Sequence, residues 1–310
     1  MSIPVKSPIQ RGYSIRVFLP NGDPEGIKRV EKFNWSGVGI IVPRSLFARA
    51  KKEHPELDRP GVYLLYPQPG LDETSAMPQV YIGESDSVLS RLGQHVAEEE
   101  KDWWTHFIAF TSSGSDQHQN LNKAHVQYLE SQLVARAQAA KRCVLKNGNT
   151  PQPPTLSKAD AADTENFLVD LLSCLPVLGY TWFEMAGLSA TGTVQNNDEE
   201  APQRFSLQGK SIQAEGYESS AGFVVCAGSQ AAKESRPSIS ENTKNLRMEL
   251  LNQGVLRDEG TCYVFTQDYA FSAPSSAASV LMGGSTNGRT AWQTAEGRTL
   301  KAIQEAQARN

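Results

Sequence analysis

The chain of 310 residues has few cysteines and no long apolar segment. Because the cysteines are far apart and form no CxxC pair, their spacing excludes a cysteine-based metal site and predicts reduced thiols. No apolar run approaches the roughly 18 residues that cross a bilayer, and the first twenty residues lack the apolar core of a signal peptide. These absences predict a cytoplasmic protein with no membrane partner. The four cysteines are Cys143, Cys174, Cys226 and Cys262.

The signatures of several large enzyme classes are also missing. The sequence contains no GxxxxGK[ST] phosphate loop, no HExxH helix and no GxSxG turn. A net charge of −4 argues against coating nucleic acid through bulk positive charge. The charge is uneven, because residues 1–59 contain eleven Lys and Arg against six Asp and Glu, while residues 60–180 have a net charge of −6. The N-terminal excess is either a solvated surface or a source of phosphate contacts.

Hydrophobic periodicity and turn residues predict four regions. Residues 1–58 form a β-rich N-terminal subdomain, and residues 59–180 follow the order strand, strand, helix, strand, helix, helix. Residues 181–203 are a polar linker, and residues 204–310 form an α+β C-terminal module. The expected fold class is α/β, with a small mixed sheet flanked by helices.

One group of residues in the second region indicates chemistry. The strand-like runs GVY at 61–63 and YIG at 81–83 are followed by Arg91 and His95 on a predicted helix. His106 lies on the next strand, and Glu130 lies on the apolar stripe of a long helix. A carboxylate on such a stripe must be paired, hydrogen-bonded or bound to a metal to offset its desolvation. A buried salt bridge, for example with Arg91, is the structural alternative.

In order and spacing, GVY, YIG, Arg91 and Glu130 resemble the GIY-YIG nucleases. The resemblance covers residues 59–150, with Val62 where the family usually has Ile. It implies a GIY-YIG-like nuclease core and a metal-dependent endonuclease that hydrolyses phosphodiester bonds, with DNA favoured over RNA as the partner. The alternative from another functional class is a catalytically idle module that binds nucleic acid in the same groove.

The resemblance also implies a role for each residue that matches. Tyr63 would be the general base or part of its relay, Tyr81 would order the attacking water, and Arg91 would neutralise charge on the phosphate. Glu130 would ligate a single Mg²⁺, with Mn²⁺ as a possible substitute. His95 and His106 match positions where some members have His. The remaining candidates for substrate binding are Gly83 and the family's terminal Asn, for which Asn147 is preferred over Asn149.

The C-terminal region contains a second resemblance. Residues 254–300 are similar to a small module found at the C-terminus of some bacterial GIY-YIG proteins, for which the family gives no established activity. Trp292 is expected to be a core residue rather than a ligand. The residues that match this module are Pro274, Ser275, Ala277, Ala278, Asn287, Gly288, Trp292 and Gly297, with Ala273 in place of its first Ser.

Overall fold

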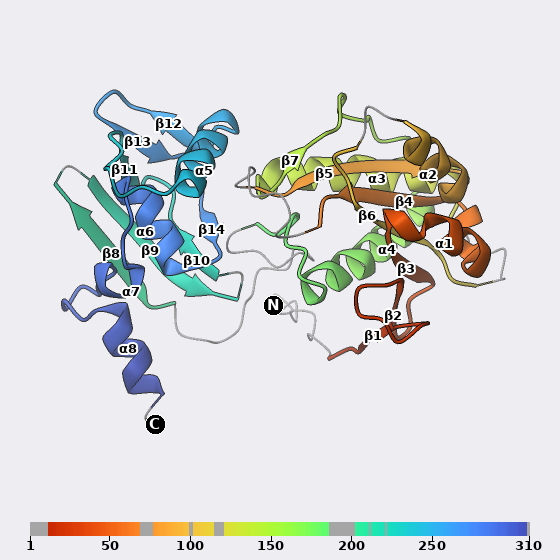
Figure 1. Cartoon of the computed structure of the whole chain (residues 1–310), viewed down its shortest axis with the longest axis horizontal. Coiled ribbons are helices and arrows are strands. Elements are labelled where there is room, and N and C mark those ends of the chain that lie inside the picture. The colour runs from red at the N-terminus through yellow and green to blue at the C-terminus, as the bar shows by residue number, and fades with distance from the viewer. Residues whose placement is uncertain are drawn as a thin grey trace, which may run out of the picture. The chain divides into compact units, whose positions relative to one another are not determined.

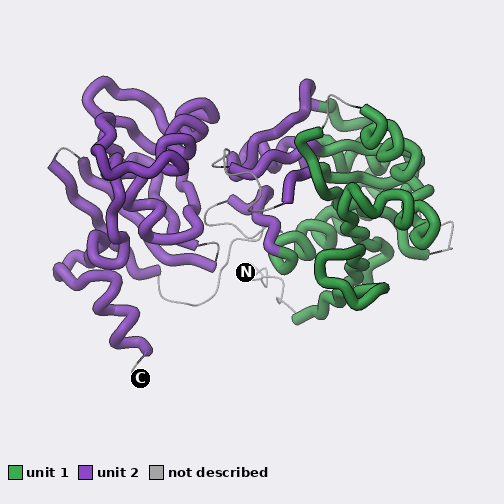
Figure 2. Tube along the Cα trace, viewed as in Figure 1, with its two compact units in different colours: residues 1–65, 82–131, 151–178 green, residues 66–81, 132–150, 179–310 purple. Residues whose placement is uncertain are grey.

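The structure is a computed structural model that divides into two compact units (Figure 2). The first unit contains residues 1–65, 82–131 and 151–178, and the second contains residues 66–81, 132–150 and 179–310. Most of the expected linker, residues 186–201, lies outside the described residues. The residues that the structure describes are 12–68, 77–98, 102–114, 121–185, 202–210, 212–220 and 222–308.

A seven-stranded mixed sheet forms the framework of the first 180 residues (Figure 1). Its strand order is β1-β2-β3-β6-β4-β5-β7. β3 pairs with β6 in the antiparallel direction, whereas β5 pairs with β7 in the parallel direction. The strands are β1 (Ile15–Phe18), β2 (Lys28–Lys32), β3 (Gly37–Pro43), β4 (Gly61–Tyr66), β5 (Gln79–Ser85), β6 (His106–Ser112) and β7 (Val144–Leu145).

The strands expected to form a separate N-terminal subdomain belong to this same sheet. β3 has the sequence GVGIIVP and is buried at every residue except its last. A strand buried on both faces needs a neighbour along each edge, and β3 has β2 on one side and β6 on the other. The pairing with β6 runs the full length of both strands, from Gly37 opposite Ser112 to Pro43 opposite His106.

In the described part of the chain, four α-helices accompany the sheet, and side-chain caps begin two of them, α2 and α4. The Ser87 side chain caps α2 by accepting a hydrogen bond from the Ser90 amide. α3 buries one stripe of residues, which includes Val126, Leu133 and Ala137. The helices are α1 (Phe47–Glu53), α2 (Val88–Ala97), α3 (Lys123–Ala140) and α4 (Lys158–Val177), so the expected α/β class is confirmed. No helix in the described part of the chain has the length and hydropathy of a membrane span.

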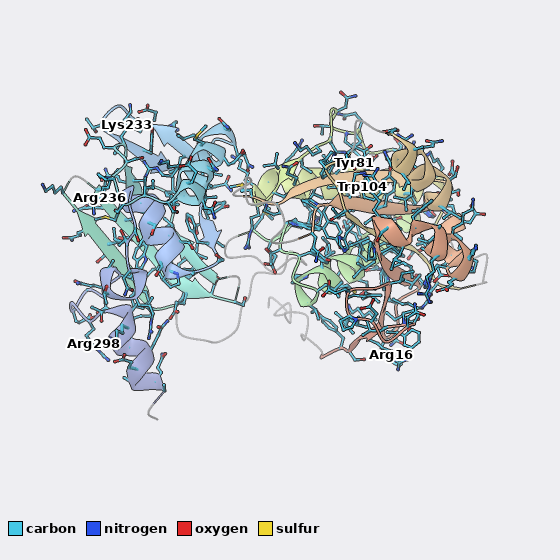
Figure 3. The ribbon with its side chains drawn as sticks, viewed as in Figure 1. Arg16, Tyr81, Trp104, Lys233, Arg236 and Arg298 are labelled. Carbon is cyan, nitrogen blue, oxygen red and sulfur yellow. The ribbon has the colours of Figure 1, made fainter. Side chains whose placement is uncertain are left out.

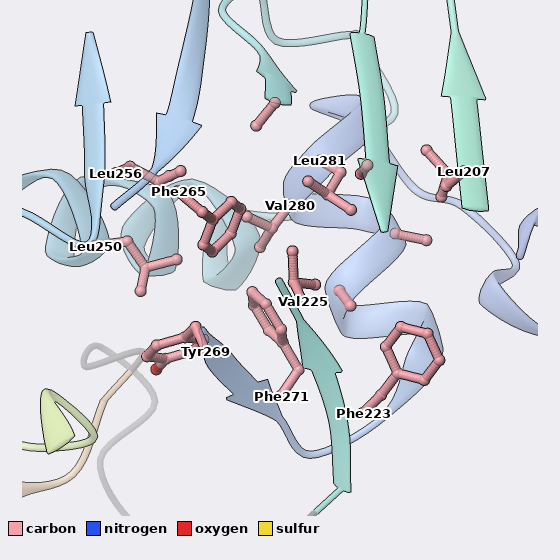
Figure 4. Packing of buried hydrophobic residues seen from close by; sticks show 14 of the residues in the cluster. Leu207, Phe223, Val225, Leu250, Leu256, Phe265, Tyr269, Phe271, Val280 and Leu281 are labelled. Carbon is pink, nitrogen blue, oxygen red and sulfur yellow. The ribbon is translucent and has the colours of Figure 1, made fainter. Parts of the chain in front are cut away.

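The C-terminal module contains two small sheets and four helices. The sheets have the strand orders β14-β10-β9-β8 and β11-β13-β12. Figure 4 shows side chains from both sheets, among them Phe223 and Phe265, in one core cluster with Leu281 of α6. The elements are β8 (Arg204–Gly209), β9 (Ile212–Ser219), β10 (Gly222–Val225), β11 (Gln230–Ala232), α5 (Glu241–Asn252), β12 (Leu256–Asp258), β13 (Cys262–Phe265), β14 (Tyr269–Phe271), α6 (Pro274–Met282), α7 (Gly288–Ala291) and α8 (Leu300–Gln307).

The matched residues of this module have structural roles. Trp292 is fully buried, its indole N–H donates to the Pro274 carbonyl at 3.1 Å, and its ring lies 4.5 Å from that of Phe223. The Gly288 amide donates to the Ser275 hydroxyl at 3.0 Å. A side chain at Gly288 would overlap the Pro274 backbone, so only glycine fits there. The prediction that Trp292 is a core residue is confirmed.

Candidate functional site

The two Gly–Tyr strands meet at the Tyr63 side chain. Tyr63 lies on β4, which is buried along its whole length. Gly83 lies on the neighbouring strand β5, and a β-carbon there would overlap the Tyr63 hydroxyl. Gly61 is equally restricted, because a β-carbon there would overlap the Phe110 carbonyl oxygen. Gly83 therefore leaves room for the Tyr63 phenol, and Gly61 allows the close approach of the Phe110 backbone.

The Tyr63 hydroxyl is joined to His95. It hydrogen-bonds to Nε2 of His95 at 2.8 Å, and both side chains are fully buried. On the other side of the imidazole, Nδ1 of His95 lies 3.6 Å from Oε2 of Glu98, which is half exposed. The phenol and the imidazole thus form a hydrogen-bonded pair in the core, with a carboxylate near the far side of the imidazole.

Arg91 occupies the same helix one turn before His95. Residues four apart on a helix are neighbours on its surface, so the guanidinium extends from the part of α2 that holds the buried imidazole. Arg91 is half-buried, and its Nη1 donates to Oε1 of Gln94 at 2.6 Å. Because this bond is to a neutral amide, the positive charge of Arg91 is not cancelled by it.

Glu130 forms an electrostatic cluster with residues at the end of β5. Burial raises the pKa of Glu130 to about 7, the Glu84 carboxylate adds to the rise, and Lys123 opposes it. Nζ of Lys123 donates to Oε2 of Glu84 at 2.8 Å and lies 3.7 Å from Asp86. A core ion pair with Arg91 would instead lower the pKa of Glu130. The raised pKa therefore argues against the salt-bridge alternative.

The donor set fits one hard divalent cation. Glu130 lies among apolar residues and within the field of a second carboxylate, and a cation would relieve both desolvation and repulsion. Carboxylate oxygens are ligands that Mg²⁺ accepts, with water completing its shell. Across the described ranges, no three His, Cys, Asp or Glu side chains converge to form a fuller ligand set. Glu130 is thus the residue that would hold the ion, with Glu84 beside it.

The other predicted residues are placed as follows. Tyr81 is half-buried on β5, and its side chain leaves the strand on the same face as Gly83, two residues later. Asn147 follows β7 and is half-buried, whereas Asn149 is exposed.

His106 begins β6 opposite Pro43. Burial lowers the pKa of His106, and the positive charge of Lys28 lowers it further. Its electrostatic neighbours therefore come from the N-terminal strands.

A separate cavity of about 730 Å³ lies elsewhere in the first unit. It contains none of the predicted site residues, and its lining includes Asp160, Asp163 and Asp170. Three carboxylates in one hollow repel phosphate, so this cavity is a poor match for a phosphodiester. The candidate residues Arg91 and Glu130 both lie outside it.

The sequence analysis missed three charged residues of the site. Glu84 directly follows YIG, but only the fold brings α3 close enough for it to act on Glu130. Lys123 is 39 residues from its partner Glu84, which makes this contact invisible to local patterns. Glu98 could have been predicted as a neighbour of His95, because residues three apart on a helix lie next to each other on its surface.

The comparisons with known proteins concern the C-terminal module. Residues 205–304 match the model of a family described as a domain of unknown function (DUF4357). This match lies inside the expected module of residues 204–310. Neither the curated proteins nor the solved structures include a match to the chain. The comparisons give no support to the nuclease resemblance of residues 59–150, which rests on the sequence motifs alone.

Proposed function

We propose that this protein is a metal-dependent endonuclease that hydrolyses phosphodiester bonds of nucleic acid, with DNA favoured over RNA. The observation that supports the proposal is the hydrogen bond between two fully buried residues of the matched set, Tyr63 and His95. Gly83 lies against the Tyr63 hydroxyl, and Arg91 lies one turn before His95 on α2. Glu130 has a raised pKa, to which the Glu84 carboxylate contributes.

Each residue then has a distinct part in hydrolysis. Tyr63, whose hydroxyl is hydrogen-bonded to His95, acts as the general base that accepts the proton of the attacking water, or as part of its relay. Arg91 neutralises the charge that grows on the phosphate oxygens in the transition state. Glu130 holds the divalent ion, which when bound polarises the phosphate. Tyr81, on the neighbouring strand β5, positions the attacking water.

The test is a single-turnover cleavage assay with labelled single-stranded, duplex and branched DNA and with RNA, in Mg²⁺ or EDTA. We expect Arg91→Ala and Glu130→Gln each to lower the rate by roughly a hundredfold, the usual loss for one electrostatic donor of about 3 kcal/mol. Both variants should keep the melting temperature of the parent. Arg298→Ala and Glu305→Gln, at exposed positions of the C-terminal module, are the matched controls and should cut normally.

Two outcomes would contradict the proposal. Full cleavage after exhaustive chelation would exclude the metal role of Glu130. Tight binding with no cleavage of any substrate in Mg²⁺ or Mn²⁺ would favour the alternative, an idle nucleic-acid-binding module that uses the same groove.

A further inference from the structure

The β1–β2 hairpin, at the edge of the seven-stranded sheet, exposes aromatic rings. Phe18 is 54% exposed and Phe33 is 75% exposed. Covering exposed rings is favourable, so two of them on one face form a candidate interaction surface. The pairing of the strands determines which face each ring occupies.

The pairing register puts both rings on one face. Phe18 is opposite Arg29 and Arg16 is opposite Glu31. The Phe33 amide donates to the Ser14 carbonyl at 3.3 Å, which continues the same register by two positions. Directly opposite residues share a face, and so do residues two apart on one strand. Phe18, Arg16 and Phe33 therefore form a row, with Arg16 between two rings that are four strand positions, or roughly 13 Å, apart.

Arg16 supplies a cation on this face (Figure 3). Arg29 donates to Glu31 at 2.8 Å and also to Glu56, so its charge is shared by two carboxylates. Arg16 is exposed, and within the described ranges no carboxylate forms an ion pair with it. A hollow of about 280 Å³ beside the row is lined by Arg16, Glu31 and Phe33. The face thus combines a free guanidinium with two rings and a recess.

We propose that this face binds single-stranded nucleic acid, with bases stacked on Phe18 and Phe33 and a phosphate on Arg16. Stacking on aromatic rings with cations between them is how proteins bind single strands without reading sequence. A duplex keeps its bases stacked on one another, so the rings favour an unpaired strand. The inference depends on the proposed nucleic-acid substrate and adds its class: a substrate with a single-stranded segment next to the cut.

The strand order sets the separation between the hairpin and the strand that holds Tyr63. β1 is four strands from β4 in the sheet order, a separation of roughly 19 Å at the usual spacing between strands. Tyr63 lies on β4 in the same compact unit. Pairing of β1 with a second copy of the chain is disfavoured, because β1 has only four residues and a charged side chain at its second position.

The test measures binding without cleavage, by fluorescence anisotropy in EDTA. The probes are a labelled 15-nucleotide single strand, its duplex and an abasic strand of equal length. Combined Phe18→Ser and Phe33→Ser should weaken binding of the base-bearing strand by roughly a hundredfold and change abasic binding little. Phe18→Tyr with Phe33→Tyr should retain binding. Met248→Ser, an equally exposed apolar residue at 60%, is the matched control and should bind as the parent does.

Arg16→Gln supplies an independent readout. It should reduce the slope of log affinity against log salt for the single strand by about 0.7, the amount expected for one lost phosphate contact. All variants change exposed side chains, so their melting temperatures should match the parent.

Several results would overturn the inference. The Ser variant could bind the base-bearing strand like the parent, or the parent could bind the abasic strand equally well; either excludes stacking while leaving the proposed nuclease intact. A change of mass in light scattering on substitution of the two rings would identify the face as an interface between copies of the chain. If the parent binds no nucleic acid of any kind, the proposed function fails together with the inference.

Discussion

The C-terminal module and the region of the seven-stranded sheet (residues 12–180, the sheet unit) differ in what their motif residues do. In the module, packing and hydrogen bonds explain the motif residues. Trp292 donates to the Pro274 carbonyl, the Gly288 amide donates to Ser275, and Gly288 has no room for a side chain. In the sheet unit, the glycines also serve packing, but Glu130 remains half-buried with a raised pKa. A residue that stability does not explain is a candidate for chemistry, and only the sheet unit has such residues in its signature.

The largest effect is expected at Trp292. Trp292→Ala should destabilise the module by about 3–5 kcal/mol, because it leaves a cavity and removes the bond to the Pro274 carbonyl. Urea unfolding of the full chain, followed by circular dichroism, would measure this loss. Because the motif residues of the module have structural roles, single-turnover cleavage by Trp292→Ala at saturating substrate should change little. A variant that is stable but inactive would mean that the module takes part in chemistry.

A smaller loss of stability is expected at Gly83. Gly83→Ala forces a methyl group against the Tyr63 hydroxyl, and overpacking of this kind costs about 1–3 kcal/mol. Because the displaced hydroxyl is the one bound to His95, this variant should also lose cleavage. Gly148→Ala, where an added β-carbon meets nothing within 4 Å, is the control for thermal melts and rates. Normal cleavage by Gly83→Ala would show that Tyr63 and His95 are only structural.

The smallest effect is the pH dependence of stability due to Glu130. Folding raises the pKa of Glu130 from 4.5 to about 7, so the folded state binds this proton more tightly than the unfolded chain. The resulting stability is present below pH 4.5 and is lost as the pH rises through about 7. Since the side chain is partly in solvent, we expect only about 1 kcal/mol.

Denaturant unfolding at pH 4.5 and pH 8 would measure this effect against Glu130→Gln, which should lack it. Mg²⁺ should raise the melting temperature of the parent more at pH 8 than at pH 5, because the ion competes with the proton for the same carboxylate. Equal pH profiles for parent and variant would refute the environment described for Glu130.

Much of the fold follows from local patterns. The apolar runs at 61–66 and 106–112 and the stripe that includes Val126 and Leu133 predict the observed strands and helix. Strand pairing is not local, so the placement of β3 beside β6 could not be derived from either segment alone. The two-residue strand β7 has no periodicity to detect. The sequence therefore predicts individual strands and helices better than it predicts which strands pair with each other.

The same limit applies to the candidate site. Tyr63, His95 and Glu130 could be identified from residue types at a characteristic spacing, and the structure joins the first two by a hydrogen bond. The influence of Glu84 and Lys123 on Glu130 depends on where α3 lies relative to the end of β5. Charges brought together by tertiary structure leave no pattern in a single sequence.

The position of β6 between β3 and β4 has a consequence for synthesis of the chain. β3 leaves the ribosome more than sixty residues before β6, a delay of roughly 3–13 s at ordinary rates of translation. During that time the apolar segment GVGIIVP has no strand on its second edge, so its backbone N–H and C=O groups on that side are unpaired. β6 then has to insert between two segments that were made before it. Slowing translation between residues 44 and 105 should therefore lower the yield of soluble protein more than slowing it after residue 112.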